Sequence, residues 1–215
     1  MATQTMSSLL DYVGGLSKPS KMPGHGYSLP ARECKAGGKL RQVENSTCSG
    51  CYAMKGRYVF PNVQAALYRR FAAIRKPLWA ETMAEILSRK GETWFRWHDS
   101  GDLQDVEHLA LIVKVCQLTP SVSHWLPTRE YRIVADYVSG GGEIPENLNI
   151  RFSAHMIGGA VPTFPRLQGL VTVSTVTRDG STEGHACPAP KQGNECRDCR
   201  ACWTRSVPLV NYKLH

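Results

Sequence analysis

Predicted strands and helices alternate along the second half of this chain, and that alternation limits the possible folds more than any other feature. Between Asp105 and Cys116 the apolar residues recur at helical spacing on one face, and a further helix is predicted at 131–138. Strand-like runs flank these helices at 93–98, 121–126, 148–153 and 170–176. This order is typical of parallel βα units, so the expected fold class is α/β. An open doubly wound sheet and a partial or complete βα barrel both fit.

In each predicted strand, polar residues occupy alternate positions and so share one face of the sheet, which favours the barrel. Strands buried on both faces of a parallel sheet are usually continuous apolar runs, but these strands alternate. The polar members of each alternation are Arg96, His98 and Ser100, then His124 and Thr128, then Arg151, Ser153 and His155. We therefore expect one face of the sheet to line a cavity that holds a polar molecule. The alternative is that these strands are half exposed to water.

We expect one main domain that ends in a cysteine-rich segment. Residues 1–24 are rich in Ser, Gly, Lys and Pro, which predicts an irregular N-terminal arm. Residues 25–180 form the expected βα domain, and 181–215 form a cysteine-rich segment packed on it. A helical region over 63–90 should break near Pro77, because proline interrupts helical hydrogen bonding.

Cysteine usage and net charge limit the cellular compartment and the kinds of partner that we expect for this protein. The sequence has no apolar run long enough for a membrane span and no apolar stretch typical of a secretory signal, so we expect a cytoplasmic location. There, clustered cysteines are more often metal ligands or catalytic groups than disulfides. The formal net charge of +8 is compatible with a nucleic-acid partner or with a solvated basic surface. The same two interpretations apply to a basic run on the predicted helix, made of Arg69, Arg70, Arg75 and Lys76.

Four of the eight cysteines form a compact rear group. Its members are Cys187, Cys196, Cys199 and Cys202. Three thiols separated by two-residue gaps, with a more distant fourth, are typical of iron–sulfur ligation. Zinc also accepts four thiolates, although its usual pattern is two separate Cys-x-x-Cys pairs. By contrast, Cys116 lies on the apolar face of its predicted helix and is expected to be a core thiol.

The remaining three cysteines, Cys34, Cys48 and Cys51, form a front group. Three ligands leave one coordination position open, and an open position is where a metal centre binds a ligand or does chemistry. If two four-ligand clusters form, the seven candidate thiols are one short, so the front centre would carry the open position. The alternative is a closed structural site that takes a ligand from the rear group, or from His25 or His185.

Polar residues follow the predicted strands at their carboxyl ends, where parallel βα folds gather their ligand sites. In His98-Asp-Ser-Gly-Asp102, His98 could act as a general base and Asp99 or Asp102 could bind an ammonium or hydroxyl group. The alternative is helix capping by Asp102 or Asp105. The expected small-molecule contacts are Ser100, Gly101, Asp102, Thr128, Arg129, Arg151 and Ser153.

Several stretches resemble the phage-encoded gene product 88 family. They are SKMPGHGYSLPARECKAG, CYAMKGRYVFPNV, FRWHDSGDLQDVEHL, HWLPTREY and GHACPAPKQGNECRDCRACW. This resemblance covers most of residues 20–215.

A looser resemblance connects Cys34 and the stretch CSGCYA to radical S-adenosylmethionine proteins. It implies a 4Fe–4S cluster on the front cysteines, a partial βα barrel, bound S-adenosylmethionine and an auxiliary cluster on the rear cysteines. The usual spacing in that superfamily is Cys-x-x-x-Cys-x-x-Cys, whereas thirteen residues separate Cys34 from Cys48 here. The stretch HDSGD stands where that superfamily has a Gly-Gly-Glu-like segment.

The sequence thus predicts an iron–sulfur protein similar to radical S-adenosylmethionine enzymes, with one or two 4Fe–4S clusters and a small molecule at the barrel mouth. The alternative is a non-enzymatic nucleic-acid-binding phage protein that zinc or an iron–sulfur cluster holds together.

Overall fold

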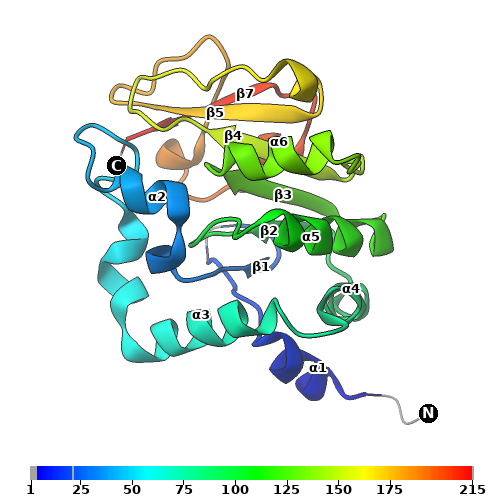
Figure 1. Ribbon diagram of the computed structural model, residues 1–215. Helices are drawn as coiled ribbons and strands as arrows, with labels where there is room; N and C mark the ends of the chain where they lie inside the picture. The colour runs from blue at the N-terminus through cyan, green and yellow to red at the C-terminus, as the bar shows by residue number, and fades with distance from the viewer. Residues whose placement is uncertain (1–3, 21, 215) are drawn as a thin grey trace.

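The computed structural model describes residues 4–20 and 22–214 and contains one open, all-parallel sheet (Figure 1). Seven strands follow the order β1-β2-β3-β4-β5-β7-β6. They are β1 (Gly26–Tyr27), β2 (Trp94–Trp97), β3 (Ser123–Thr128), β4 (Leu148–Ser153), β5 (Val171–Thr177), β6 (His185–Ala186) and β7 (Leu209–Lys213). The edge strands β1 and β6 are not paired with each other. The α/β class is therefore confirmed, and the sheet is compatible with a partial barrel but not with a complete one.

Helices pack on one face of this sheet, which we call the helix-covered face (Figure 1). They are α1 (Met6–Val13), α3 (Pro61–Ala73), α4 (Trp79–Lys90), α5 (Val106–Leu118) and α6 (Tyr131–Ser139), while the short α2 (Lys35–Leu40) lies at the carboxyl ends of the strands. The predicted break near Pro77 is confirmed, since α3 ends before it and Leu78 adopts a left-handed conformation. No helix in the described part of the chain has the length and apolar character needed to cross a bilayer.

The expectation of an irregular arm over residues 1–24 is wrong for helix α1. Thr5 caps its start by accepting a hydrogen bond from the backbone N–H of Ser8, and Gly14 ends it with φ of 79°. Leu9 and Val13, four residues apart, are buried against the main core. A single helix of eight residues gave too short a periodic pattern to stand out from the polar residues around it.

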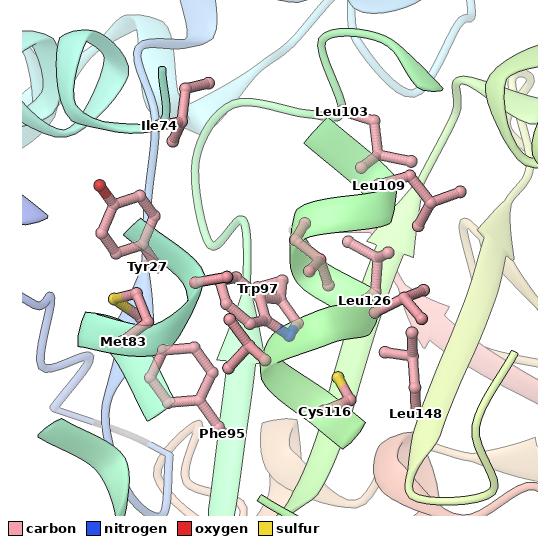
Figure 2. Close-up of a cluster of buried hydrophobic side chains, with 14 of the residues drawn as sticks. Tyr27, Ile74, Met83, Phe95, Trp97, Leu103, Leu109, Cys116, Leu126 and Leu148 are labelled. Atoms are coloured by element: carbon pink, nitrogen blue, oxygen red, sulfur yellow. The ribbon is translucent and has the colours of Figure 1, made fainter. Parts of the chain in front are cut away.

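The main core lies between the sheet and its helices (Figure 2). Phe95 and Trp97 of β2 meet Met83 of α4, and Leu109 of α5 lies near Leu126 of β3. Cys116 is fully buried in this cluster, which confirms its expected position in the core.

On β4 the polar residues share one face, as expected, but the C-terminal segment covers that face in place of the expected cavity, and on β3 the expected polar face is wrong. His124 shares its face with Leu126, stacks on Trp97 with ring centroids 6.0 Å apart, and lies 2.9 Å from the Thr119 hydroxyl. It therefore belongs to the helix-covered face. Because β3 is buried on both faces, its polar residues alternate without marking a cavity.

The opposite face of the sheet, which we call the inner face, is covered by residues of the C-terminal segment. Asn149 donates a hydrogen bond of 2.8 Å to the Cys202 carbonyl. Arg151 donates to the carbonyls of Val173, Ala201 and Val207 at 2.7–3.0 Å. The inner face of β4 thus binds a loop backbone through buried polar side chains.

Candidate functional site

The front cysteines converge at the carboxyl ends of the strands. Cys34 immediately precedes α2, and Cys51 donates its backbone N–H to the Cys48 carbonyl at 3.1 Å. A Cβ built on Gly37, in the first turn of α2, would lie 3.6 Å from Cys48 Sγ and 3.7 Å from Cys34 Sγ. Glycine therefore leaves the space between these two sulfurs free of a side chain.

The front cysteines lie close enough together to influence one another's pKa values. Burial raises the pKa of the Cys34 thiol, and Asp102, Cys48 and Cys51 raise it further. Burial also raises the pKa of Cys48, which Arg129 opposes. Burial outweighs the nearby arginines, so the Cys34 and Cys48 thiols are neutral at pH 7, and a bound metal would supply the further positive charge that deprotonates them.

The rear cysteines converge on the inner face around β6 and β7. Cys187 and Cys199 raise the pKa of Cys196, although burial is the larger cause. Cys199 Sγ lies 3.5 Å from His185 Nε2, and Cys202 Sγ lies 3.0 Å from the Tyr212 hydroxyl. His185 is thus a neighbour of the rear group, whereas the His25 ring contacts the Glu92 carboxylate.

All seven candidate ligands are free thiols. No group of three or more His, Cys, Asp or Glu side chains within residues 4–20 and 22–214 is arranged so that it could hold a metal ion. Zinc–sulfur bonds are about 2.3 Å long, so a single zinc ion would need all of its cysteine sulfurs close around one point. The metal ligands named from the sequence therefore stay predictions.

Asp102 organises the polar residues beside the front group. It accepts hydrogen bonds from the Thr128 hydroxyl at 2.6 Å, from the Arg129 N–H at 2.9 Å and from the Leu103 N–H at 2.8 Å. Burial raises its pKa to about 6, although these hydrogen bonds act in the opposite direction. Asp102, Thr128 and Arg129 are thus brought together, as the sequence predicts.

The other residues of the HDSGD stretch face different neighbours. Asp99 pairs with Arg96 at 3.1 Å and accepts a hydrogen bond from the Tyr58 hydroxyl. Ser100 donates to the Leu29 carbonyl at 2.8 Å. Gly101 has φ of +84°, and a Cβ there would lie 2.6 Å from Leu29 Cβ, so only glycine fits. This stretch therefore mainly fixes the loop against the residues after β1.

His98 packs against helix α5 rather than joining Asp102. It has φ of 54°, and its ring lies 5.3 Å from that of His108. Both ring nitrogens are buried without a hydrogen-bond partner among the described residues. Burial lowers the pKa of His98 well below its ordinary value, so the ring is neutral. The geometry offers no hydrogen-bonded partner for a general base here.

Arg151 and Ser153 are also separate from the predicted pocket. Arg151 binds the C-terminal segment, and Ser153 accepts a hydrogen bond of 3.2 Å from Ser174. The alternative capping role is confirmed for Asp105, which accepts the His108 N–H at 2.9 Å. The basic run does not form one helix face, since Arg70 is buried in α3 while Arg75 and Lys76 lie beyond its end at Ala73, where Arg75 pairs with Asp105.

Arg96 is a site residue that the sequence analysis placed on the polar face of its strand but did not name as a ligand contact. Its guanidinium lies 4.4 Å above the Trp125 ring on the inner face. Burial alone would lower its pKa, but Asp99, Tyr52 and Tyr212 raise it instead, and its charge also influences Cys202. Arg96 therefore interacts both with the residues after Cys51 and with the rear group. The signal in the sequence was one arginine among the aromatic residues of strand β2.

Comparison with known proteins identifies the family. No curated protein and no solved structure matches this chain. The family model described as Gene product 88 matches residues 3–205, which is most of the chain. The chain therefore belongs to the phage gene product 88 family, as its sequence motifs predict.

Proposed function

We propose that this protein is an iron–sulfur protein whose front cysteines hold a cluster with an open coordination position. The observation that carries the proposal is the convergence of Cys34, Cys48 and Cys51 beside Asp102, at the carboxyl edge of an open parallel sheet. Ligand sites of parallel βα folds are typically found at this edge.

The donor set suits a cluster in two respects. The side-chain-free space at Gly37 adjoins two of the front sulfurs, and thiolates are the ligands that iron–sulfur clusters use. The rear group supplies four further thiols on the inner face, and we propose that these bind an auxiliary cluster. When bound, such a cluster supplies one-electron chemistry and, at an iron without a protein ligand, a position for a small molecule.

The chain's own polar residues would orient that molecule. Arg129 donates its Nε to the Thr47 hydroxyl at 3.0 Å, which holds the guanidinium near Cys48. A cation there stabilises a thiolate and attracts an anionic ligand group. Asp102 keeps the Arg129 backbone in place through the hydrogen bond to its N–H. S-Adenosylmethionine, which carries both a carboxylate and an ammonium group, is the ligand we propose first.

Paired variants separate the two centres. In the Cys48→Ser/Cys51→Ser variant we expect loss of front-cluster iron and of any S-adenosylmethionine-dependent change in the electron paramagnetic resonance of the reduced protein. In Cys196→Ser/Cys199→Ser the front signal should persist, and Cys116→Ser should match the wild type. If the front double variant keeps the wild-type iron content and spectrum, the front assignment is wrong.

A nucleic-acid-binding protein is the second candidate, and the segment following Cys51 favours it. Tyr52 and Phe60 each expose 53% of their surface, and Tyr68 is also exposed. The same stretch exposes three basic residues, Lys55, Arg57 and Arg69. Exposed aromatic rings interleaved with basic side chains are typical of single-strand binding.

Fluorescence anisotropy with a labelled single-stranded oligonucleotide tests this candidate. Binding that weakens steeply with salt, and weakens further in Phe60→Ala and Arg57→Gln, would support it. Equal binding by wild type and both variants would count against this surface.

A further inference from the structure

A pocket of about 300 Å³ lies at the β1 edge of the sheet, between the N-terminal segment and helix α3. It is separate from the hydrogen bonds around Asp102 and from the rear cysteines. Its polar side chains are Ser17, Lys18, Ser28, Tyr58, Arg70 and Asp99, and its apolar wall is made of Pro19, Val63 and Leu67.

Arg70 is the unusual member of this lining. Only 6% of its surface is exposed, yet the described residues supply no carboxylate to pair with it. Its Nε donates to the Ser28 carbonyl at 2.7 Å. For its two Nη atoms the described residues supply no hydrogen-bond acceptor, and these atoms are not among the fully buried unpartnered ones. The Nη groups therefore reach solvent where Arg70 lines the pocket.

Because the rest of the Arg70 side chain is buried, its charged end depends on what enters the pocket, and no described carboxylate pairs with it. Burial lowers the pKa of Arg70, Tyr27 opposes this shift, and the adjacent Arg69 adds to it. The one carboxylate in the lining, Asp99, is already paired with Arg96 and accepts a hydrogen bond from Tyr58. Lys18 adds a second, exposed positive charge to the same pocket. The unpaired charge of the lining is thus positive.

We propose that this pocket binds a small organic anion whose carboxylate or phosphate pairs with Arg70 and Lys18. The planar guanidinium offers two parallel N–H donors, which suit either group. Val63, Leu67 and Pro19 would contact an apolar body attached to the anionic group. This inference does not depend on the metal content of the cysteine groups.

Isothermal titration calorimetry at low ionic strength, with phenyl phosphate and with phenylacetate as probes, tests the proposal. Both probes carry the same apolar ring, so their comparison distinguishes a phosphate site from a carboxylate site. We expect saturable binding of at least one probe to the wild type, at least about tenfold weaker binding to Arg70→Gln, and weaker binding to Lys18→Gln. Arg132→Gln is the matched control, because Arg132 is exposed on α6 and does not line the pocket, and it should bind like the wild type.

The proposal is overturned if neither probe binds the wild type, or if Arg132→Gln weakens binding as much as Arg70→Gln does. Because Arg70 is buried, its replacement could unfold the protein. In that case Lys18→Gln decides, since Lys18 is exposed: weaker binding supports the pocket, and unchanged binding contradicts it.

Discussion

The two faces of the sheet hold their neighbours by different means. On the helix-covered face, Phe95, Trp97 and Leu126 bury large apolar side chains against regular helices. On the inner face a smaller apolar cluster around Trp125 and Trp203 is joined by hydrogen bonds that Asn149 and Arg151 donate to carbonyls of a segment with little regular structure. Apolar burial favours helices with a continuous stripe, whereas backbone hydrogen bonds can fix an irregular segment. The inner face is therefore suited to positioning a cysteine-rich loop.

The two faces also give a buried thiol different surroundings. Cys116 is fully buried in the helix-covered core, and burial raises its pKa well above the ordinary value. Cys202 is almost as buried, but it contacts the Tyr212 hydroxyl and shares its surroundings with Cys187 and Arg96. Burial alone thus does not distinguish a core thiol from a candidate metal ligand. The polar groups around the thiol make that distinction.

Replacing Arg151 with Met should have the largest effect, because it removes three hydrogen bonds on the inner face. The carbonyls of Val173, Ala201 and Val207 would lose their donor while staying largely buried. We expect the free energy of unfolding to fall by about 3 kcal/mol, measured by urea denaturation. Arg132→Met, at an exposed position of α6, should stay within about 0.5 kcal/mol of the wild type. Equal stability of the two variants would contradict the hydrogen-bonded account of the inner face.

Acid should destabilise the helix-covered face through its buried histidines. Burial lowers the pKa of His124 to about 3, so the folded state resists protonation while the unfolded chain takes up a proton near pH 6.5. The stability contribution is complete above that pH and is lost as the pH falls. From pH 7 to pH 5, His124 should account for a loss of about 2 kcal/mol.

His124→Gln measures this contribution. The variant should be less stable than the wild type at pH 7, and the difference should shrink at pH 5, as followed by thermal or urea unfolding. A difference that stays constant between the two pH values would contradict neutral burial of His124.

Cysteine replacements compare the faces directly. Cys116→Ala should cost about 1 kcal/mol of packing and leave the metal content unchanged. Cys202→Ala should remove metal from the rear group instead. Metal analysis of both purified variants decides, and loss of metal in Cys116→Ala would overturn its assignment to the core.

Gly37→Ala should have the smallest effect on stability but a specific effect on the front group. Its Cβ would lie 3.0 Å from Cys34 Cβ and enter the space beside the Cys34 and Cys48 sulfurs. We expect front-cluster iron to fall while the unfolding free energy changes by less than about 1 kcal/mol. Gly38→Ala, in the same helix, meets only a side-chain nitrogen of Arg41 at 3.6 Å and should keep its iron. Equal iron content in the two variants would remove the role assigned to the Gly37 space.

Local patterns predicted much of the fold. The apolar stripe of α5, its Asp105 cap and the break near Pro77 depend on residues close together in the chain, and each is confirmed, except that Val106 at the start of the stripe is exposed. The same periodicity placed Cys116 in the core. The convergence of Asp102, Thr128 and Arg129 followed from a general property of parallel sheets, in which successive strands end at one edge.

Features that depend on what covers each face could not be predicted in this way. The polar alternation of β3 does not reveal that helices, and not a cavity, cover His124. Arg151 resembles a ligand contact in the sequence, and its carbonyl partners lie 22 to 56 residues away. Likewise, the basic pattern of α3 gives no sign that Arg70 is the buried member.

Iron and acid-labile sulfide analysis of the anaerobically purified wild-type protein tests the central claim most directly. The account predicts a brown protein with broad absorption near about 400 nm and about four irons and four sulfides for each cluster present. Two clusters would fill both cysteine groups, and one would leave the variants above to show which group holds it. A colourless protein that contains stoichiometric zinc and no labile sulfide would contradict the iron–sulfur assignment.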